Sequence, residues 1–156
     1  MRLAPLAALC LTSLALAACN SSEANIRMTP APLPELEGKW LPVGLVGSCA
    51  DGHIRFAPNA IYAFNGAEPR KMGDILRITV AGPKLDVLIA NADRNGEHQI
   101  VALDSTGGKI AMTDLKTAQG ESLKTLPAGV PTTFREQAAA SVKSVAPLEK
   151  LERCGA

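Results

Sequence analysis

The sequence is poor in aromatic residues, in histidine and in charge of one sign. Aromatic side chains make up 3% of the 156 residues, there are two histidines, and 16 basic residues nearly balance 15 acidic ones. No run or stripe of basic residues is present, so the electrostatic signature of a nucleic-acid-binding protein is missing. We therefore expect no nucleic-acid partner and a core built mainly from Val, Ile, Leu and Ala.

Groups that carry out catalysis or bind metals are also scarce. The histidines, His53 and His98, belong to no recognised ligand pattern such as H-E-x-x-H. A metal site would need the strand of Asp51 and His53 to lie beside that of Glu97 and His98. No serine lies in a G-x-S-x-G motif, and the glycine pairs lack the helix that a phosphate-binding loop requires. The sequence thus predicts no enzyme, no metal and no cofactor.

Residues 1–18 have the organisation of a signal peptide. Arg2 supplies one positive charge, and an apolar run then ends in small residues before Cys19. A transmembrane helix needs about 20 apolar residues, whereas this run is shorter and contains Pro5. The segment LAAC at 16–19 resembles the lipobox of bacterial lipoproteins. That resemblance implies cleavage before Cys19, a diacylglyceryl group on its sulfur and a further acyl chain, such as palmitate, on its amine.

The same resemblance implies where the protein is held. Each buried methylene of an acyl chain contributes about 0.8 kcal/mol, and two membrane-binding signals give stable attachment. In some Gram-negative bacteria, a residue such as Asn20 after the lipidated cysteine implies transport to the outer membrane. We expect an outer membrane lipoprotein that faces the periplasm, with exposure at the cell surface as the alternative.

Processing leaves two unmodified cysteines, Cys49 and Cys154, because Cys10 is removed and Cys19 is lipidated. The oxidising periplasm favours a disulfide between them, and two unconnected thiols are the alternative. The bond would close a loop of about 100 residues, for which the chain-entropy model gives roughly 4 to 5 kcal/mol.

Residues 19–37 are expected to form a lipidated tether, because they are polar and then contain prolines at 30, 32 and 34. An extended segment of this length reaches roughly 50 Å at about 3.1 Å per residue. Packing of the segment along the edge of the domain is the alternative.

Residues 38–126 contain short apolar runs with a period of two, which is typical of antiparallel strands with one face on a core. Turn signals such as Asn95-Gly96 separate these runs. Because open sheet edges invite aggregation, we predict a mainly β fold, a small antiparallel up-and-down β-barrel of about seven to eight strands. The expected strands are 38–46, 53–57, 60–64, 74–80, 84–90, 97–104, 109–115 and 121–126.

Residues 127–156 are expected to form a C-terminal α-helical tail that packs on the barrel. Thr133 and Glu136 have the spacing of a capping box, and apolar residues at helical intervals predict a helix over 134–146. Pro147 ends this helix and opens a second, short one that leads to Cys154.

The motif G-x-W at 38–40, followed by Cys49 and the strand 54–56, resembles the Inh-type β-barrel inhibitors of secreted bacterial metalloproteases. The tail from residue 115 has no counterpart in that family. The same motif opens lipocalins, in which the tryptophan closes one end of the barrel against a basic side chain. Through that resemblance, Trp40 and Arg135 are expected to close the barrel by a cation–π contact of about 1 kcal/mol. A plain core role for Trp40 is the alternative.

These resemblances imply two functions, both non-catalytic. An inhibitor-like protein would be a protein-binding module, with residues 26–35 as an arm that enters a protease cleft. A lipocalin-like protein would carry a small apolar ligand, which is the alternative. Strands of about five to seven residues enclose a low barrel that its own side chains can fill. We therefore favour a protein-binding module whose partners are the membrane, through its lipid, and an envelope protein.

Overall fold

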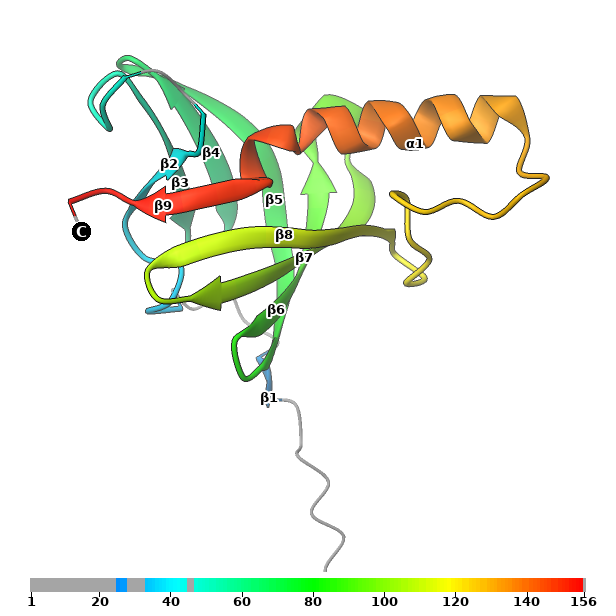
Figure 1. The fold of residues 1–156 in the computed structure, drawn as a ribbon, viewed down its shortest axis with the longest axis horizontal. Coiled ribbons are helices and arrows are strands. Elements are labelled where there is room, and N and C mark those ends of the chain that lie inside the picture. Colours follow the sequence, from blue (N-terminus) through cyan, green and yellow to red (C-terminus); the bar gives the residue numbers. More distant parts are fainter. Residues whose placement is uncertain (1–24, 28–32, 45–46, 156) are drawn as a thin grey trace, which may run out of the picture.

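The computed structural model describes residues 25–27, 33–44 and 47–155. Its body is a closed ring of eight antiparallel strands (Figure 1). Around the ring the strands follow the order β5-β4-β3-β2-β9-β8-β7-β6, and β6 pairs with β5 to close it. The predicted fold class, a mainly β antiparallel barrel, is confirmed. The ring consists of β2 (Lys39–Pro42), β3 (Gly52–Ala57), β4 (Ala60–Asn65), β5 (Glu68–Ala81), β6 (Lys84–Asn91), β7 (Glu97–Thr106), β8 (Lys109–Thr117) and β9 (Lys150–Arg153).

Strands β2 to β8 form a meander, because each pairs with the next along the chain. Tight turns connect β3 to β4, β4 to β5, β5 to β6 and β7 to β8, whereas residues 43–51 connect β2 to β3 and the 3-10 helix Ala92–Arg94 lies between β6 and β7. Gly107 and Gly108 have positive φ in the β7–β8 turn, which few other residues tolerate. Strand β5 is longer than predicted, since it also includes residues 68–73, which pair with β4. The second half of β5 pairs with β6, so this one long strand pairs with β4 along its first half and with β6 along its second.

The strand that closes the barrel is β9, which was predicted as part of a helix. It lies between β2 and β8, so that Leu151 is the partner of both Pro42 and Ile110. Pro147 lies only in the single 3-10 turn Ala146–Leu148. The predicted strand 121–126 is wrong, because in that stretch only an isolated bridge joins Ser122 to Lys116. The tail therefore completes the barrel as well as packing on it.

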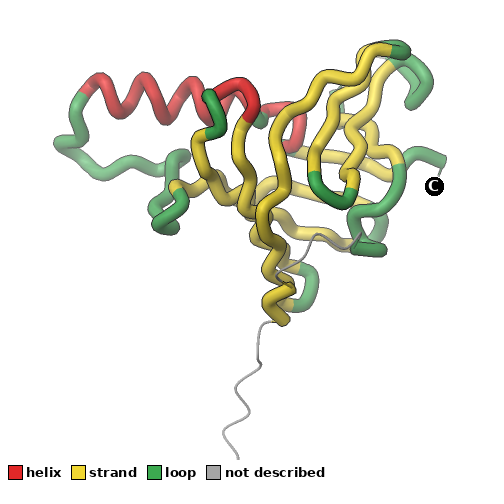
Figure 2. Tube along the Cα trace, turned by 180° about the vertical axis from the view of Figure 1, so that it is seen from behind, coloured by secondary structure: helices red, strands yellow, loops and turns green. Residues whose placement is uncertain are grey.

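Helix α1 (Thr132–Ser144) crosses one end of the barrel and extends beyond it (Figure 2). The prediction of 134–146 is displaced by two residues at each end. The predicted capping box is wrong, because the helix is preceded by Pro131 and has no side-chain cap. Ala138 and Ser141 are its buried residues. Only part of α1 is thus covered by the barrel.

The barrel interior is filled with apolar side chains from every wall. Trp40, Val87 and Leu115 are 0% exposed. At the end of the barrel where the β3–β4, β5–β6 and β7–β8 turns lie, Leu33 and Leu36 plug the opening, and the hollow beside them measures about 10 Å³. We call this the plug end, and the opposite one, covered by α1, the helix end. Other large side chains that are almost fully buried are Ile54, Ile61, Leu85, Ile89, Leu103, Ile110, Leu148, Leu151 and Gln99.

The predicted signal peptide, lipobox and Cys19 lie outside the described residues. The described parts of the predicted tether pack on the barrel, as in the alternative arrangement. Strand β1 (Asn25–Arg27) pairs with β5, and the plug residues Leu33 and Leu36 are buried. These leucines bury their apolar surface against the open barrel end. In an extended tether the same surface would be exposed to water.

Close approach of β5 and β6 at Gly73 leads to a first prediction. A Cβ atom at this position would lie 2.8 Å from the carbonyl oxygen of Ala90, a backbone atom that can move only with its strand. We expect Gly73→Ala to lower the free energy of unfolding by about 1 to 3 kcal/mol through this overlap. Urea denaturation checks the value, with Ala139→Gly on the exposed face of α1 as a control for an ordinary Gly/Ala difference of about 1 kcal/mol. A Gly73→Ala protein as stable as the wild type would contradict the tight packing.

Candidate functional site

Trp40 closes the plug end together with a basic side chain. Its Nε1 donates a hydrogen bond of 2.9 Å to the carbonyl oxygen of Leu36. The guanidinium carbon of Arg153 lies 4.9 Å from the centre of the Trp40 ring, because the two residues are partners across β2 and β9. Arg153 also donates to the carbonyls of Pro34 and Glu35, at 3.4 and 3.2 Å. The arginine therefore holds the plug over the tryptophan.

Arg135, predicted as the partner of Trp40, has a different position and role. It lies in the first part of α1, and it donates hydrogen bonds of 3.1 and 3.2 Å to the carbonyls of Val130 and Pro127. These bonds hold the segment before α1 against the helix. The prediction was wrong because the sequence pattern around β9 indicates a helix. A strand that places Arg153 opposite Trp40 was therefore not expected.

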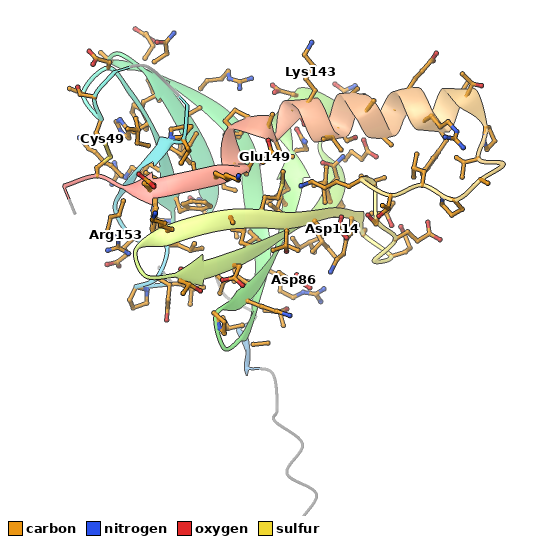
Figure 3. All side chains as sticks on the ribbon, in the orientation of Figure 1. Cys49, Asp86, Asp114, Lys143, Glu149 and Arg153 are labelled. Carbon is orange, nitrogen blue, oxygen red and sulfur yellow. A yellow bond between two sulfur atoms is a disulfide. The ribbon has the colours of Figure 1, made fainter. Side chains whose placement is uncertain are left out.

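The predicted disulfide between Cys49 and Cys154 is confirmed. Their Cα atoms lie 6.0 Å apart across a sequence separation of 105 residues. Cys49 belongs to the loop between β2 and β3, and Cys154 follows β9 (Figure 3). The backbone N–H of Cys154 also donates to the carbonyl of Lys39 at 2.9 Å. The bond thus fixes the closing strand to the first part of the barrel.

His53 lies beneath the loop that carries Cys49 and is 8% exposed. Its ring stacks on Phe64, with ring centres 4.5 Å apart and an angle of 6° between the planes. Its Nδ1 lies 3.0 Å from the carbonyl oxygen of Cys49. Burial lowers the pKa of His53, and the hydrogen bond to Cys49 opposes part of this effect. The side chain is a structural histidine that stays neutral at physiological pH.

This lowered pKa predicts a pH dependence of stability. Below the ordinary histidine pKa of about 6.5, the unfolded chain binds a proton that folded His53 resists, so the free energy of unfolding should fall as the pH drops from 7.5 to 5. Replacement of His53 by Phe keeps the stack and removes the titration, so it should flatten the curve over this range. Urea denaturation at each pH measures both proteins. The matched variant is His98→Gln, which removes an exposed histidine on another strand. A curve for His53→Phe as steep as that of the wild type would contradict the prediction.

A polar cluster joins α1 to the barrel at the helix end. Asn91 accepts a hydrogen bond from the backbone N–H of Asp93 at 3.0 Å, which fixes the orientation of its amide. Its Nδ2 then donates to Oε1 of Gln99 at 3.0 Å and to Oγ of Ser144 at 2.8 Å. Gln99 is fully buried, and its Nε2 has no hydrogen-bond partner among the described residues. The cluster orients the C-terminal half of α1.

From Arg135 onward, α1 forms a groove with the segment 123–126. The groove has a volume of about 830 Å³. Its apolar lining includes Leu123, Leu126, Ala138 and Val142. A second hollow of about 260 Å³ shares Leu126 and continues to Phe134. We call the two together the α1 groove.

The rim of the α1 groove carries an excess of positive charge. Lys124, Arg135 and Lys143 line it, against the carboxylates of Glu149 and Glu121. Figure 3 labels Lys143 and Glu149 of this set. None of the three basic side chains forms an ion pair with residues 25–27, 33–44 or 47–155. An apolar groove with uncompensated cations is suited to an apolar ligand that also carries negative charge.

A third hollow lies on the outer surface of β5 to β8. It has a volume of about 390 Å³ and is lined by Thr79, Asp86, Thr113 and Lys116, among others. Its charges are compensated internally, because the Lys116 ammonium lies 3.7 Å from Asp86. Asp114, which also lines the hollow and is labelled with Asp86 in Figure 3, accepts a hydrogen bond of 2.8 Å from the Ser122 hydroxyl. This hollow differs from the α1 groove in that one of its basic side chains, Lys116, is paired with a carboxylate.

Groups for metal binding do not converge in the part of the chain that the structure describes. Within that part, no three His, Cys, Asp or Glu side chains gather to hold a metal ion. His53 lies on β3 beside β4, whereas His98 lies on β7 and is the partner of Ala90. No helix within the described ranges has both the length and the apolar character needed to cross a membrane. Comparisons of the chain with protein-family models, with curated proteins and with solved structures found no match.

Proposed function

We propose that this protein is an outer membrane lipoprotein that faces the periplasm and acts as a non-catalytic protein-binding module. The observation that carries the proposal is the contrast between a barrel filled by its own side chains and an open apolar groove outside it. A filled barrel serves as a rigid scaffold, and binding surfaces on such scaffolds lie on the connecting segments. The α1 groove belongs to such a segment, between β8 and β9.

The groove, rather than an N-terminal arm, is the proposed binding surface. An inhibitor-like arm over residues 26–35 would have to leave the barrel, yet β1 pairs with β5 and the plug residue Leu33 is buried. The α1 groove, by contrast, already faces solvent at Lys124, Arg135 and Lys143.

The proposed partner of the α1 groove is a protein segment that combines apolar side chains with acidic ones. Apolar residues of the segment would pack on Leu126 and Val142, and its carboxylates would lie near Lys124 and Lys143. Arg135 contributes charge while it remains bonded to the carbonyls of the preceding segment. Such complementarity raises association rates and rejects basic partners.

A carrier of a small apolar ligand is less well supported. That function needs a hollow interior, and Leu85, Leu103 and Leu115 fill the middle of this barrel with 1% or less of each side chain exposed. The plug and the C-terminal half of α1 cover its ends.

Site-specific photo-crosslinking in intact cells tests the groove. A benzophenone amino acid replaces Ala139, which is exposed in the groove, and in a control it replaces Thr106 at the plug end. We expect a crosslinked envelope protein at position 139 alone, and mass spectrometry should find apolar and acidic residues in its crosslinked peptide. Equal crosslinking at both positions, or a basic crosslinked peptide, would count against the groove.

The lipid anchor is tested separately. Cys19→Ser should abolish metabolic labelling with palmitate and release the protein from membrane fractions. A Cys19→Ser protein that stays in the membrane fraction would refute the anchor.

A further inference from the structure

We infer that the plug end of the barrel lies against the lipid surface, while the α1 groove faces away from it. This inference rests on the proposed lipid anchor at Cys19, and it assigns a membrane-facing surface that the anchor alone does not specify.

The strand β1 fixes the place where the anchor reaches the barrel. Its Asn25 is the partner of Val80, and its Ile26 is the partner of Thr79. Both partners lie at the C-terminal end of β5, next to the β5–β6 turn at the plug end. The chain from the membrane therefore joins the barrel at this end.

The chain between the anchor and β1 is short. Residues 20–24 separate Cys19 from Asn25, and a fully extended chain of this length spans at most about 20 Å. This is less than half of the roughly 50 Å that a free tether over 19–37 would reach. The plug end must therefore stay close to the headgroups, which limits how far the barrel can turn.

Helix α1 lies at the other end of the barrel. The chain leaves β8 at Thr117, forms α1, and returns to β9 at Lys150, and both of these strand ends belong to the helix end. Figures 1 and 2 show β1 and α1 on opposite sides of the barrel in both views. Strand β6, with eight residues, measures about 25 Å along its own axis. The groove is thus held away from the lipid, where a protein can reach it.

Charge at the plug end is balanced, so the short chain alone sets the orientation. Lys109 forms an ion pair of 3.2 Å with Glu152, and Lys84 is the cross-strand partner of Asp104. A surface of this kind has no preference for anionic lipid. The same orientation is therefore expected on neutral bilayers.

Fluorescence quenching from the bilayer tests the orientation. The full acylated protein is reconstituted into phosphatidylcholine vesicles that contain a lipid with a nitroxide on its headgroup. One fluorophore is placed on Thr106→Cys at the plug end, and in a second protein on Gln137→Cys of α1, since the disulfide leaves Cys49 and Cys154 unreactive. We expect the label at 106 to be quenched several-fold more strongly than the label at 137. Equal quenching, or stronger quenching at 137, would overturn the inference.

A longer linker supplies the matched control. Insertion of about 20 glycine and serine residues after Asn20 adds roughly 25 Å of average reach. The inserted protein should stay on the vesicles and lose most of the quenching at 106. A quenching pattern unchanged by the insertion would show that the short chain does not set the orientation. If even the uninserted protein fails to bind vesicles, the anchor itself is refuted, which separates the two failures.

Discussion

Trp40→Ala is expected to lower the free energy of unfolding by about 3 to 5 kcal/mol. The tryptophan is 0% exposed, so its removal leaves a cavity between β2 and the plug. It also leaves the carbonyl of Leu36 without its donor and Arg153 without the ring on which it lies. Urea denaturation of the oxidised protein, followed by circular dichroism, measures the loss.

Two further variants separate the causes of this loss. Trp40→Phe keeps an aromatic ring for Arg153 but removes the Nε1 donor, so it should cost less than the alanine variant, about 1 to 3 kcal/mol. Val43→Ala removes apolar surface at a side chain that is 55% exposed, and it should change stability by less than about 0.5 kcal/mol. An alanine variant at position 40 that melts like the wild type would contradict the closure of the plug end.

Removal of the disulfide is expected to have an effect of similar size. For a closed loop of about 105 residues, the chain-entropy model gives close to 5 kcal/mol as an upper value. Loss of the bond should also destabilise the native state, because the bond holds the end of β9, a strand of only four residues that closes the barrel. Denaturation of the wild type with and without a thiol reductant measures the contribution.

The double variant Cys49→Ser, Cys154→Ser is the control for this prediction. It should be as unstable as the reduced wild type, and a reductant should not change it further. Alkylation of both cysteines in the native protein without a reductant would show that the bond is absent in solution. If a reductant does not change the unfolding of the wild type, the proposed contribution of the disulfide to stability is contradicted.

The sequence predicts those parts of the barrel in which side chains alternate between core and solvent. The expected strand 84–90 agrees with β6 (Lys84–Asn91), in which Leu85, Val87 and Ile89 face the core. The turn at Gly82-Pro83 before β6 and the residues Asn95-Gly96 before β7 are recognisable in the sequence, and Gly82, Asn95 and Gly96 have positive φ. In these strands, local pattern and tertiary packing favour the same conformation.

The closing strand could not be predicted because its own residues do not specify it. Strand β9 has the sequence KLER, with Leu151 as its only core residue. It is extended because β2 and β8 each offer a free edge, and both pair with it. This tertiary requirement outweighs the local helical pattern. The error over Arg135 and Arg153 has the same origin.

The site was predicted only in part, for related reasons. Phe134, Ala138 and Val142 have the helical spacing that predicts an apolar face, but spacing does not say how much of that face the barrel covers. Ala138 is buried, whereas Phe134 and Val142 are only half-buried, so part of the stripe becomes one wall of a groove. The plug residues Leu33 and Leu36 were missed because their proline-rich surroundings favour a linker.

The central claim is that the α1 groove binds an acidic, apolar segment of an envelope protein. The most direct measurement is the yield of the crosslink from position 139 after reversal of the rim charge by Lys124→Glu with Lys143→Glu. We expect the yield to fall by about tenfold, equivalent to roughly 1.4 kcal/mol of binding free energy, with the melting temperature preserved. Lys84→Glu at the plug end should leave the yield unchanged. A crosslink of the same yield after reversal of both rim charges would contradict the claim.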